Sequence, residues 1–332
     1  MHVEVHISKG ERVVAIDKTI YGTPLTQETV ELYWCVYKNL EKEVIALTDV
    51  ISFDDTQMNV YSIRIAELIL RIAAEIESLC KDLYETLALP HPNNGFKFDF
   101  HCIKAFNERW GIESKVVTIV HPLVRFSQKD IYPFKNATNG TAEKCTSNIW
   151  KFANNEVKHN LRNCLKSATI RALVEGMAAL YLLNVYSRYQ QHPQGLQSRT
   201  AAELFDPTLG SDLFKVGVQR VLDVHGDADR FEMLAVEPDL KSVFRIIPTN
   251  DALKCMRDLL KRVSSDAIIY FRSRAFEQDG DVLAVRIQQD RINRLSSEAR
   301  MYALHKHAGE FSKVIETMSY QVSLIENASC AH

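Results

Sequence analysis

The chain of 332 residues is 46% hydrophobic and 25% charged, which is typical of a packed globular protein with room for one large domain or two ordinary ones. Its 40 basic and 42 acidic residues give a net charge of −2. This balance excludes a protein that binds nucleic acid over its whole surface and limits any such site to a local patch. No apolar run reaches the roughly 18 residues of a membrane span, and the N-terminus lacks the apolar core of a secretory signal. We therefore expect a cytoplasmic protein that does not contact a membrane.

The cysteines argue for a reducing compartment, because they are odd in number and never form a Cys-x-x-Cys pair. The sequence also contains no phosphate-binding loop, dinucleotide-binding fingerprint, Gly-x-Ser-x-Gly elbow or His-Glu-x-x-His motif, which disfavours the standard nucleotide-binding and hydrolase classes. We expect no cofactor and no metal ion. The seven cysteines are Cys35, Cys80, Cys102, Cys145, Cys164, Cys255 and Cys330.

The first elements expected are a hairpin and a helix. Residues 1–24 predict an N-terminal hairpin extension, because apolar residues alternate with polar ones on both sides of a Lys9-Gly10 turn. Thr26 is a suitable N-cap for a helix that continues to about Val50.

The clearest helix follows, with Ser62 as its N-cap and a proline-rich stretch as its end. Apolar residues recur along it at spacings of three and four, which draws one apolar stripe: Ile69, Ile72, Ile76, Leu79, Leu83 and Leu87. A shorter helix over about 100–110 ends at Gly111. The apolar runs 116–120 and 124–134 then predict a small β-hairpin.

Two more helices are expected at about 147–163 and 165–191. The second is apolar around much of its circumference, which is typical of a helix in the centre of a bundle. Taken together, these elements predict a mainly α fold. Residues 25–195 would form a helical bundle with a small β-hairpin insertion.

Residues 199–329 predict a smaller C-terminal domain, α+β or helical, whose type the sequence does not identify. The elements expected in it are helices at 211–224 and 249–263, a β-hairpin of strands 268–276 and 282–287 around an Asp279-Gly280 turn, and a closing helix at 296–327.

One helix carries a polar stripe that suits phosphate chemistry. Asn155 and His159 are four residues apart and share a face, and Arg162 is expected to extend the same stripe, with Lys158 beside it. An imidazole can move protons near neutral pH, while lysine and arginine attract phosphate and stabilise developing negative charge. This combination suits metal-independent cleavage of RNA by its own ribose hydroxyl. The competing interpretation is a solvated helix face.

The stretch that contains this stripe resembles the motif helix of the HEPN family, helical-bundle proteins of bacterial defence and toxin systems. Active HEPN ribonucleases carry Arg-Asn-x-x-x-His; Asn155 and His159 match it, whereas Asn154 stands where the arginine would be. The match is closer to a subgroup with Asn-x-x-Lys-His. The resemblance covers residues 31–190. It implies a homodimeric bundle that binds or cuts RNA in bacterial stress or phage defence.

In that family an acidic residue on the earlier long helix often faces the motif helix. Glu75 and Glu77 are the candidates here, and either would orient His159 or pair with Lys158. The competing interpretation is structural, because Glu77 and Lys81 also form an i,i+4 ion pair in the favourable order.

Two other groups of residues are weaker candidates. His305, His307 and Glu310 suggest a metal site only faintly, because histidines two apart on a helix point about 200° apart. Arg272 and Arg274 would share one face of the expected strand, from which they would reach phosphate.

Three functions remain open. The first is an RNA-binding protein or metal-independent ribonuclease that acts as a homodimer. The second is a non-catalytic dimerising module that recruits a protein partner through its C-terminal segment, which Asn154 and the near-neutral charge favour. The third places an activity in residues 199–332, with the bundle as a sensor.

Overall fold

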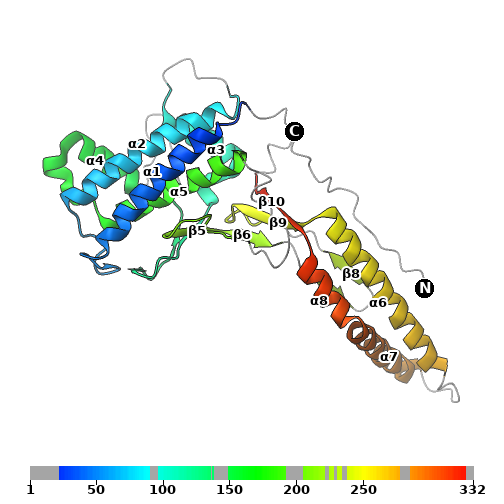
Figure 1. Ribbon diagram of the computed structural model, residues 1–332. Coiled ribbons are helices and arrows are strands. Elements are labelled where there is room, and N and C mark those ends of the chain that lie inside the picture. Colours follow the sequence, from blue (N-terminus) through cyan, green and yellow to red (C-terminus); the bar gives the residue numbers. More distant parts are fainter. Residues whose placement is uncertain are drawn as a thin grey trace.

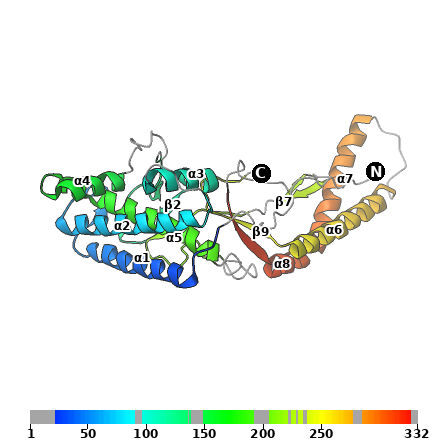
Figure 2. The ribbon, with the colours of Figure 1, turned by 90° about the horizontal axis from the view of Figure 1, so that it is seen from above.

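The structure is a computed structural model that describes residues 22–89, 96–135, 137, 149–191, 205–220, 224–227, 230–233, 238–276 and 285–326. The strands expected within residues 1–24 and the domain boundary expected between residues 195 and 199 lie outside the described residues. The described part is mainly α-helical, as predicted. A helical bundle lies at one end, an arm of helices lies at the other, and short strands lie between them (Figures 1 and 2).

The bundle begins with two long helices that start where their N-caps predict. Helix α1 spans Gln27–Leu47, and the Thr26 hydroxyl accepts a 3.2 Å hydrogen bond from a first-turn backbone N–H. Helix α2 spans Ile63–Glu85, and the Ser62 hydroxyl accepts a 3.1 Å bond in the same way. Each cap satisfies a donor that the helix itself leaves free. The apolar stripe predicted for α2 is buried: Ile69, Ile72, Ile76, Leu79, Leu83 and Leu87.

Helix α5 (Ile170–Gln191) is the central helix, as its composition predicts, and it packs against α1, α2 and α4. Its small residues allow the neighbours to approach closely. A Cβ atom added at Gly176 would lie 3.3 Å from the Trp150 Cβ and 3.4 Å from an Ile72 methyl group. None of the helices in the described part of the chain is apolar over enough length to cross a membrane.

Along the chain, α3 (Ile103–Trp110) and a few short strands lie between α2 and the later helices of the bundle. Helix α3 ends, as predicted, at Gly111, whose φ of 63° is left-handed and suits glycine. Strand β2 (Val117–Ile119) pairs antiparallel with β4 (Asp130–Ile131), so the predicted hairpin is present in part.

The remaining segment of that hairpin pairs elsewhere. Strand β3 (Val124–Arg125) runs parallel to β1 (Phe53–Asp54) rather than returning along β2. The other side of β2 is taken by β5 (Phe214–Val216), which comes from the C-terminal half of the chain. The bundle and the C-terminal half therefore share a sheet.

The prediction of a helix at residues 211–224 is wrong, because the described part of this segment contains short strands and no helix. After β5, the chain continues through Gly217 into β6 (Val218–Arg220), which pairs in parallel with β9 (Phe244–Pro248). Strand β10 (Tyr320–Leu324) completes that sheet antiparallel to β9. The partners of these strands lie far away in sequence, so no local signal indicates the pairing.

The helices of the arm, which lie within residues 250–317, also differ from the prediction. Residues 268–276, expected as a strand, belong to one long helix, α6 (Asn250–Phe276), and α7 (Val285–Lys306) packs beside it. The expected helix 296–327 is interrupted: α8 (Ala308–Thr317) follows α7, and β10 follows α8. A small antiparallel hairpin, β7 (Val224–Asp227) with β8 (Arg230–Met233), lies earlier in the chain.

A buried carboxylate ties the bundle to the segment after it. Glu41 on α1 is fully buried, and one of its oxygens accepts bonds from the hydroxyls of Tyr37 (2.8 Å) and Ser211 (2.5 Å). The same oxygen accepts the backbone N–H groups of Asp212 and Leu213, each at 3.0 Å. Since a buried charge is tolerated only when it is paired or hydrogen-bonded, this network holds residues 211–213 in place.

Candidate functional site

Helix α4 (Ile149–Cys164) carries the predicted motif and is fixed to the bundle by its first half. Trp150, Ala153 and Val157 are its buried residues. The Trp150 indole N–H donates to the Pro133 carbonyl (3.1 Å), and the carboxylate of Glu175 on α5 accepts the Trp150 backbone N–H (3.3 Å). The start of the motif helix is therefore anchored.

The motif residues point away from this anchored face. Asn155 and His159 each lie two positions from the buried Val157, which is about 200° around a helix. Both side chains are exposed, as is Lys158 between them. The structure therefore places these three residues together on the solvent side of the bundle.

Arg162 does not continue that stripe in the predicted way. The backbone of Asn160 is not helical, with φ −155° and ψ 68°, so the helix axis breaks directly after His159. The Asn160 side chain accepts the Asn163 backbone N–H at 3.3 Å, which starts a new short turn. Arg162 is exposed on that turn rather than one helical turn beyond His159.

The end of α4 and the turn after it form a basic surface. It consists of Lys158, His159, Arg162 and Lys166, all exposed, and we call it the α4 basic surface. Within the described part of the chain none of the four has an ion-pair partner. Glu156, the one acidic residue of α4, instead interacts with the Cys164 thiol and raises its pKa. The cations of this surface are therefore available to an external anion.

The two candidate carboxylates on α2 face other neighbours. Glu77 forms an ion pair with Lys81 at 2.6 Å. Glu75 lies near Tyr33 of α1. Burial and Asp82 raise the pKa of that phenol, the Ser78 hydrogen bond opposes them, and the charge of Glu75 adds a smaller increase. No hydrogen bond or ion pair joins either glutamate to His159 or Lys158 among the described residues.

Two residues of this region are missed by the sequence interpretation. Lys166 lies in the short turn Leu165–Ser167 after α4 and adds a fourth exposed basic residue; its closeness to Arg162 in the sequence was the available signal. Glu175 anchors α4, and its signal was an acidic residue inside an otherwise apolar helix. Burial raises the pKa of Glu175 to about 7, although the backbone N–H of Trp150 favours its ionised form.

Chemically, the α4 basic surface combines groups that bind phosphate with one that transfers protons. Lysine and arginine hold phosphate through charge-assisted hydrogen bonds, and an imidazole can serve as a general acid or base. Asn154, which directly precedes Asn155, is half-buried. This surface therefore has the means to bind a polyanion through three cations and to present a histidine to it.

The histidines of the arm do not form a metal site. His307 is buried and contacts Asp266 through Nε2 (2.7 Å) and Glu310 through Nδ1 (3.0 Å), while His305 is exposed. No group of three or more metal-ligating side chains occurs among residues that the structure describes. Arg272 and Arg274 lie on α6, not on the expected strand.

Comparisons with known proteins identify no similar protein. No family model matches the chain, and neither the curated proteins nor the solved structures searched give a match.

Proposed function

We propose that this protein acts on RNA through the α4 basic surface, as a HEPN-like RNA-binding protein or metal-independent ribonuclease. The observation that carries the proposal is the group of four exposed basic side chains, Lys158, His159, Arg162 and Lys166, without a carboxylate partner in the described part of the chain. A chain with a net charge of −2 would have to bind RNA through such a local patch.

The anchoring of α4 supports this role. A site works best when the side chains that contact the ligand are held on a rigid element. Helix α4 is held by Trp150, which is buried, and by Glu175 on the central helix. His159 lies two residues after the buried Val157 and directly before the break at Asn160, and its imidazole is open to solvent.

The experiment is a binding and cleavage assay with a labelled single-stranded RNA, in buffer with a chelator and no added metal. We expect binding that weakens steeply with salt, because phosphate contacts release counterions. Replacing Lys158 and Arg162 by alanine should reduce the slope of the logarithm of affinity against the logarithm of salt concentration by about 0.7 per lost contact. Cleavage lost in His159→Ala, with binding retained, would identify a ribonuclease.

Matched controls come from exposed residues elsewhere. Lys42 on α1 and His305 on α7 are both exposed, so Lys42→Ala and His305→Ala should leave binding and cleavage unchanged. Binding without cleavage would leave an RNA-binding protein. A wild-type protein that neither binds nor cuts RNA would refute the proposal.

A second candidate function, dimerisation and recruitment of a protein partner, is favoured by the arm. Ile269 on α6 and Met301 on α7 are 65% and 64% exposed. Exposed apolar side chains indicate an interaction surface where they form a contiguous patch. The Tyr270 and Tyr302 rings stack at 4.5 Å between the same two helices. Sedimentation of the wild type against Ile269→Lys with Met301→Lys tests it. A dimer that the double variant leaves intact would count against the arm.

A further inference from the structure

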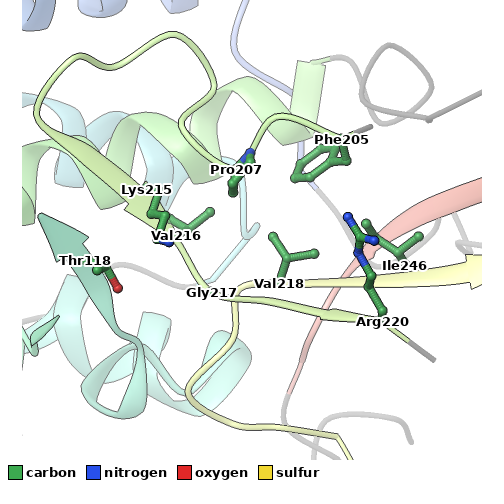
Figure 3. Close-up of a pocket in the computed structure, with 9 residues that line it drawn as sticks. All are labelled: Thr118, Phe205, Pro207, Lys215, Val216, Gly217, Val218, Arg220 and Ile246. Carbon is green, nitrogen blue, oxygen red and sulfur yellow. The ribbon is translucent and has the colours of Figure 1, made fainter. Parts of the chain in front are cut away.

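A pocket of about 290 Å³ lies between the segment after the bundle and the two short strands β5 and β6 (Figure 3). These strands lie away from α4 (Figure 1). Phe205 and Pro207 line one side, and Val216, Val218 and Ile246 supply further apolar surface. Its volume is at the lower end of the range for small-molecule sites. The pocket is partly open to solvent, so a ligand can place one ring system in it and extend its polar groups to the rim.

The wall of this pocket is preformed. The Pro207 carbonyl accepts the Val216 backbone N–H (3.0 Å) and the Tyr181 hydroxyl (3.1 Å), which ties the 205–207 segment to β5 and to α5. Phe205 packs edge-on against the buried Phe244, with ring centroids 5.3 Å apart. A ligand would therefore not have to order this wall, which lowers the cost of binding.

The opposite side of the pocket is equally constrained. At Gly217, between β5 and β6, an added Cβ atom would lie 3.0 Å from the Ser242 Cα. The Gly217 carbonyl also accepts the Val243 backbone N–H at 2.9 Å. A side chain at this position would require the Ser242 backbone to shift, so glycine suits the close approach of these two backbone segments.

Two cations stand at different ends of the pocket. Lys215 and Thr118 line one end, and Arg220 and Ile246 line the other, with the Arg220 side chain extending towards Ile246 and Phe205 (Figure 3). Both cationic residues are exposed, and neither has an ion-pair partner among the described residues. Asp130 accepts the Thr118 hydroxyl at 2.7 Å but lies on β4, across β2 from Lys215.

We propose that this pocket binds one nucleotide that carries phosphate groups on both sides of its sugar. The base would stack on Phe205, since aromatic rings bind bases of any sequence by stacking. Arg220 and Lys215 would each hold one phosphate, because guanidinium and ammonium groups are the usual phosphate ligands. A nucleoside with one phosphate would leave one of the two cations without a partner.

This ligand chemistry has two sources, a nucleotide inside an RNA strand and a free nucleoside 3′,5′-bisphosphate. The RNA source is the one we favour, and it rests on the proposed function. In that case the pocket is a second contact on the same strand, well away from the α4 basic surface. The free bisphosphate needs no such assumption, so it provides the independent probe.

The test is calorimetric titration of the full chain with adenosine 3′,5′-bisphosphate and with adenosine 5′-monophosphate. We expect the bisphosphate to bind and the monophosphate to bind about tenfold more weakly or worse, in line with the loss of one charge-assisted contact. Lys215→Ala and Arg220→Ala should each weaken the bisphosphate to a similar extent, and Phe205→Leu should weaken both ligands. Lys42→Ala is the matched control and should change neither affinity.

The outcomes separate the pocket from the proposed function. A bisphosphate that does not bind, or that binds Lys215→Ala and Arg220→Ala as tightly as wild type, overturns the pocket proposal whatever RNA does. If the bisphosphate result holds and RNA affinity also falls in these variants, the ligand is a nucleotide within RNA. If RNA affinity stays at the Lys42→Ala value, the ligand is the free nucleotide. Loss of RNA binding in the α4 variants is a separate readout that judges the α4 basic surface alone.

Discussion

The carboxylate of Glu175, on the central helix α5, accepts the backbone N–H of Trp150 in the first turn of α4, at 3.3 Å. A negative charge at that point also suits the positive end of the helix dipole. Burial acts in the other direction and raises the pKa of Glu175 from 4.5 to about 7. The contact that anchors the candidate RNA-binding helix therefore contains a carboxyl group that changes its charge near neutral pH.

The first prediction concerns the pH dependence of stability. Since the pKa of Glu175 is about 7 in the folded state against an ordinary 4.5, the folded state binds more protons between these pH values. Wild type should therefore lose stability relative to Glu175→Gln as pH rises from 4.5 to 7, by up to about 3 kcal/mol. Urea unfolding of both proteins at pH 5 and pH 8 measures this. A stability difference between the two that does not change with pH would refute it.

The second prediction contrasts two glutamates on α1. Glu41 is fully buried and accepts several hydrogen bonds, whereas Glu43 pairs on the surface with Arg64 (2.5 Å) and Arg71 (2.8 Å). Glu41→Ala should cost about 3 kcal/mol or more, because it leaves buried donors without an acceptor. Glu43→Ala should cost less than about 1 kcal/mol, as exposed pairs do. Equal losses in chemical unfolding would contradict this account of the Glu41 network.

The third prediction concerns the junction between α7 and α8. His307 bonds Asp266 and Glu310 through its two ring nitrogens, and these contacts raise its pKa, Asp266 most strongly. Because both nitrogens can donate only when the ring is protonated, the full contact exists below the ordinary pKa of 6.5. It is lost as pH rises through the higher pKa of the folded state.

The measurement is amide hydrogen exchange in α8, corrected for the intrinsic effect of pH. Two other charges meet at this junction: Lys306 contacts Asp266 (2.9 Å), and Arg262 contacts Glu310 (2.8 Å). These cations stay charged, so they should not produce the change. Protection in wild type should fall above neutral pH, and His307→Gln should remove that dependence. The exposed His305 provides the control, and His305→Gln should behave as wild type.

The sequence was a good guide where the local pattern and the packing agree. Thr26 and Ser62 cap the helices that they were predicted to cap, and the α2 stripe is buried as its spacing requires. The apolar composition of α5 also placed it correctly in the centre. These features depend on helical periodicity and on caps, both of which a single segment of sequence contains.

It failed where distant contacts decide the structure. Residues 268–276 are rich in β-favouring side chains, such as Ile268, Ile269 and Tyr270, yet they are helical because α6 packs along α7. Residues 214–220 are strands because β2 and β9 offer partners from distant parts of the chain. Propensity is a weak prior that such packing overrides.

The candidate site shows the same division. The exposure of Asn155, Lys158 and His159 follows from the helical period. The break at Asn160 had a local signal, since asparagine side chains bond to nearby backbone and compete with the helix. The nucleotide pocket had none, because its residues come together only when the sheets have formed.

The last prediction tests the junction between the bundle and the arm. Lys115 is 1% exposed, and its ammonium group donates to the carbonyls of Ser242 (2.9 Å), just before β9, and Ile325 (3.3 Å), just after β10, at the same end of this antiparallel pair. Burial lowers its pKa from 10.5 to about 8, against the opposing effect of Asp239. Between pH 8 and 10.5 the unfolded state therefore binds more protons than the folded state.

Stability contributed by this residue should consequently rise with pH across that window. Relative to Lys115→Met, which has a similar length and no charge, wild type should become more stable between pH 7.5 and pH 10. The expected change is about 1–3 kcal/mol. Unfolding in urea at the two pH values, for both proteins, gives this difference and cancels the titration of the tyrosines that the two share. A wild type that loses stability relative to Lys115→Met as pH rises would show that the lysine remains charged in the folded protein, held by the two carbonyls.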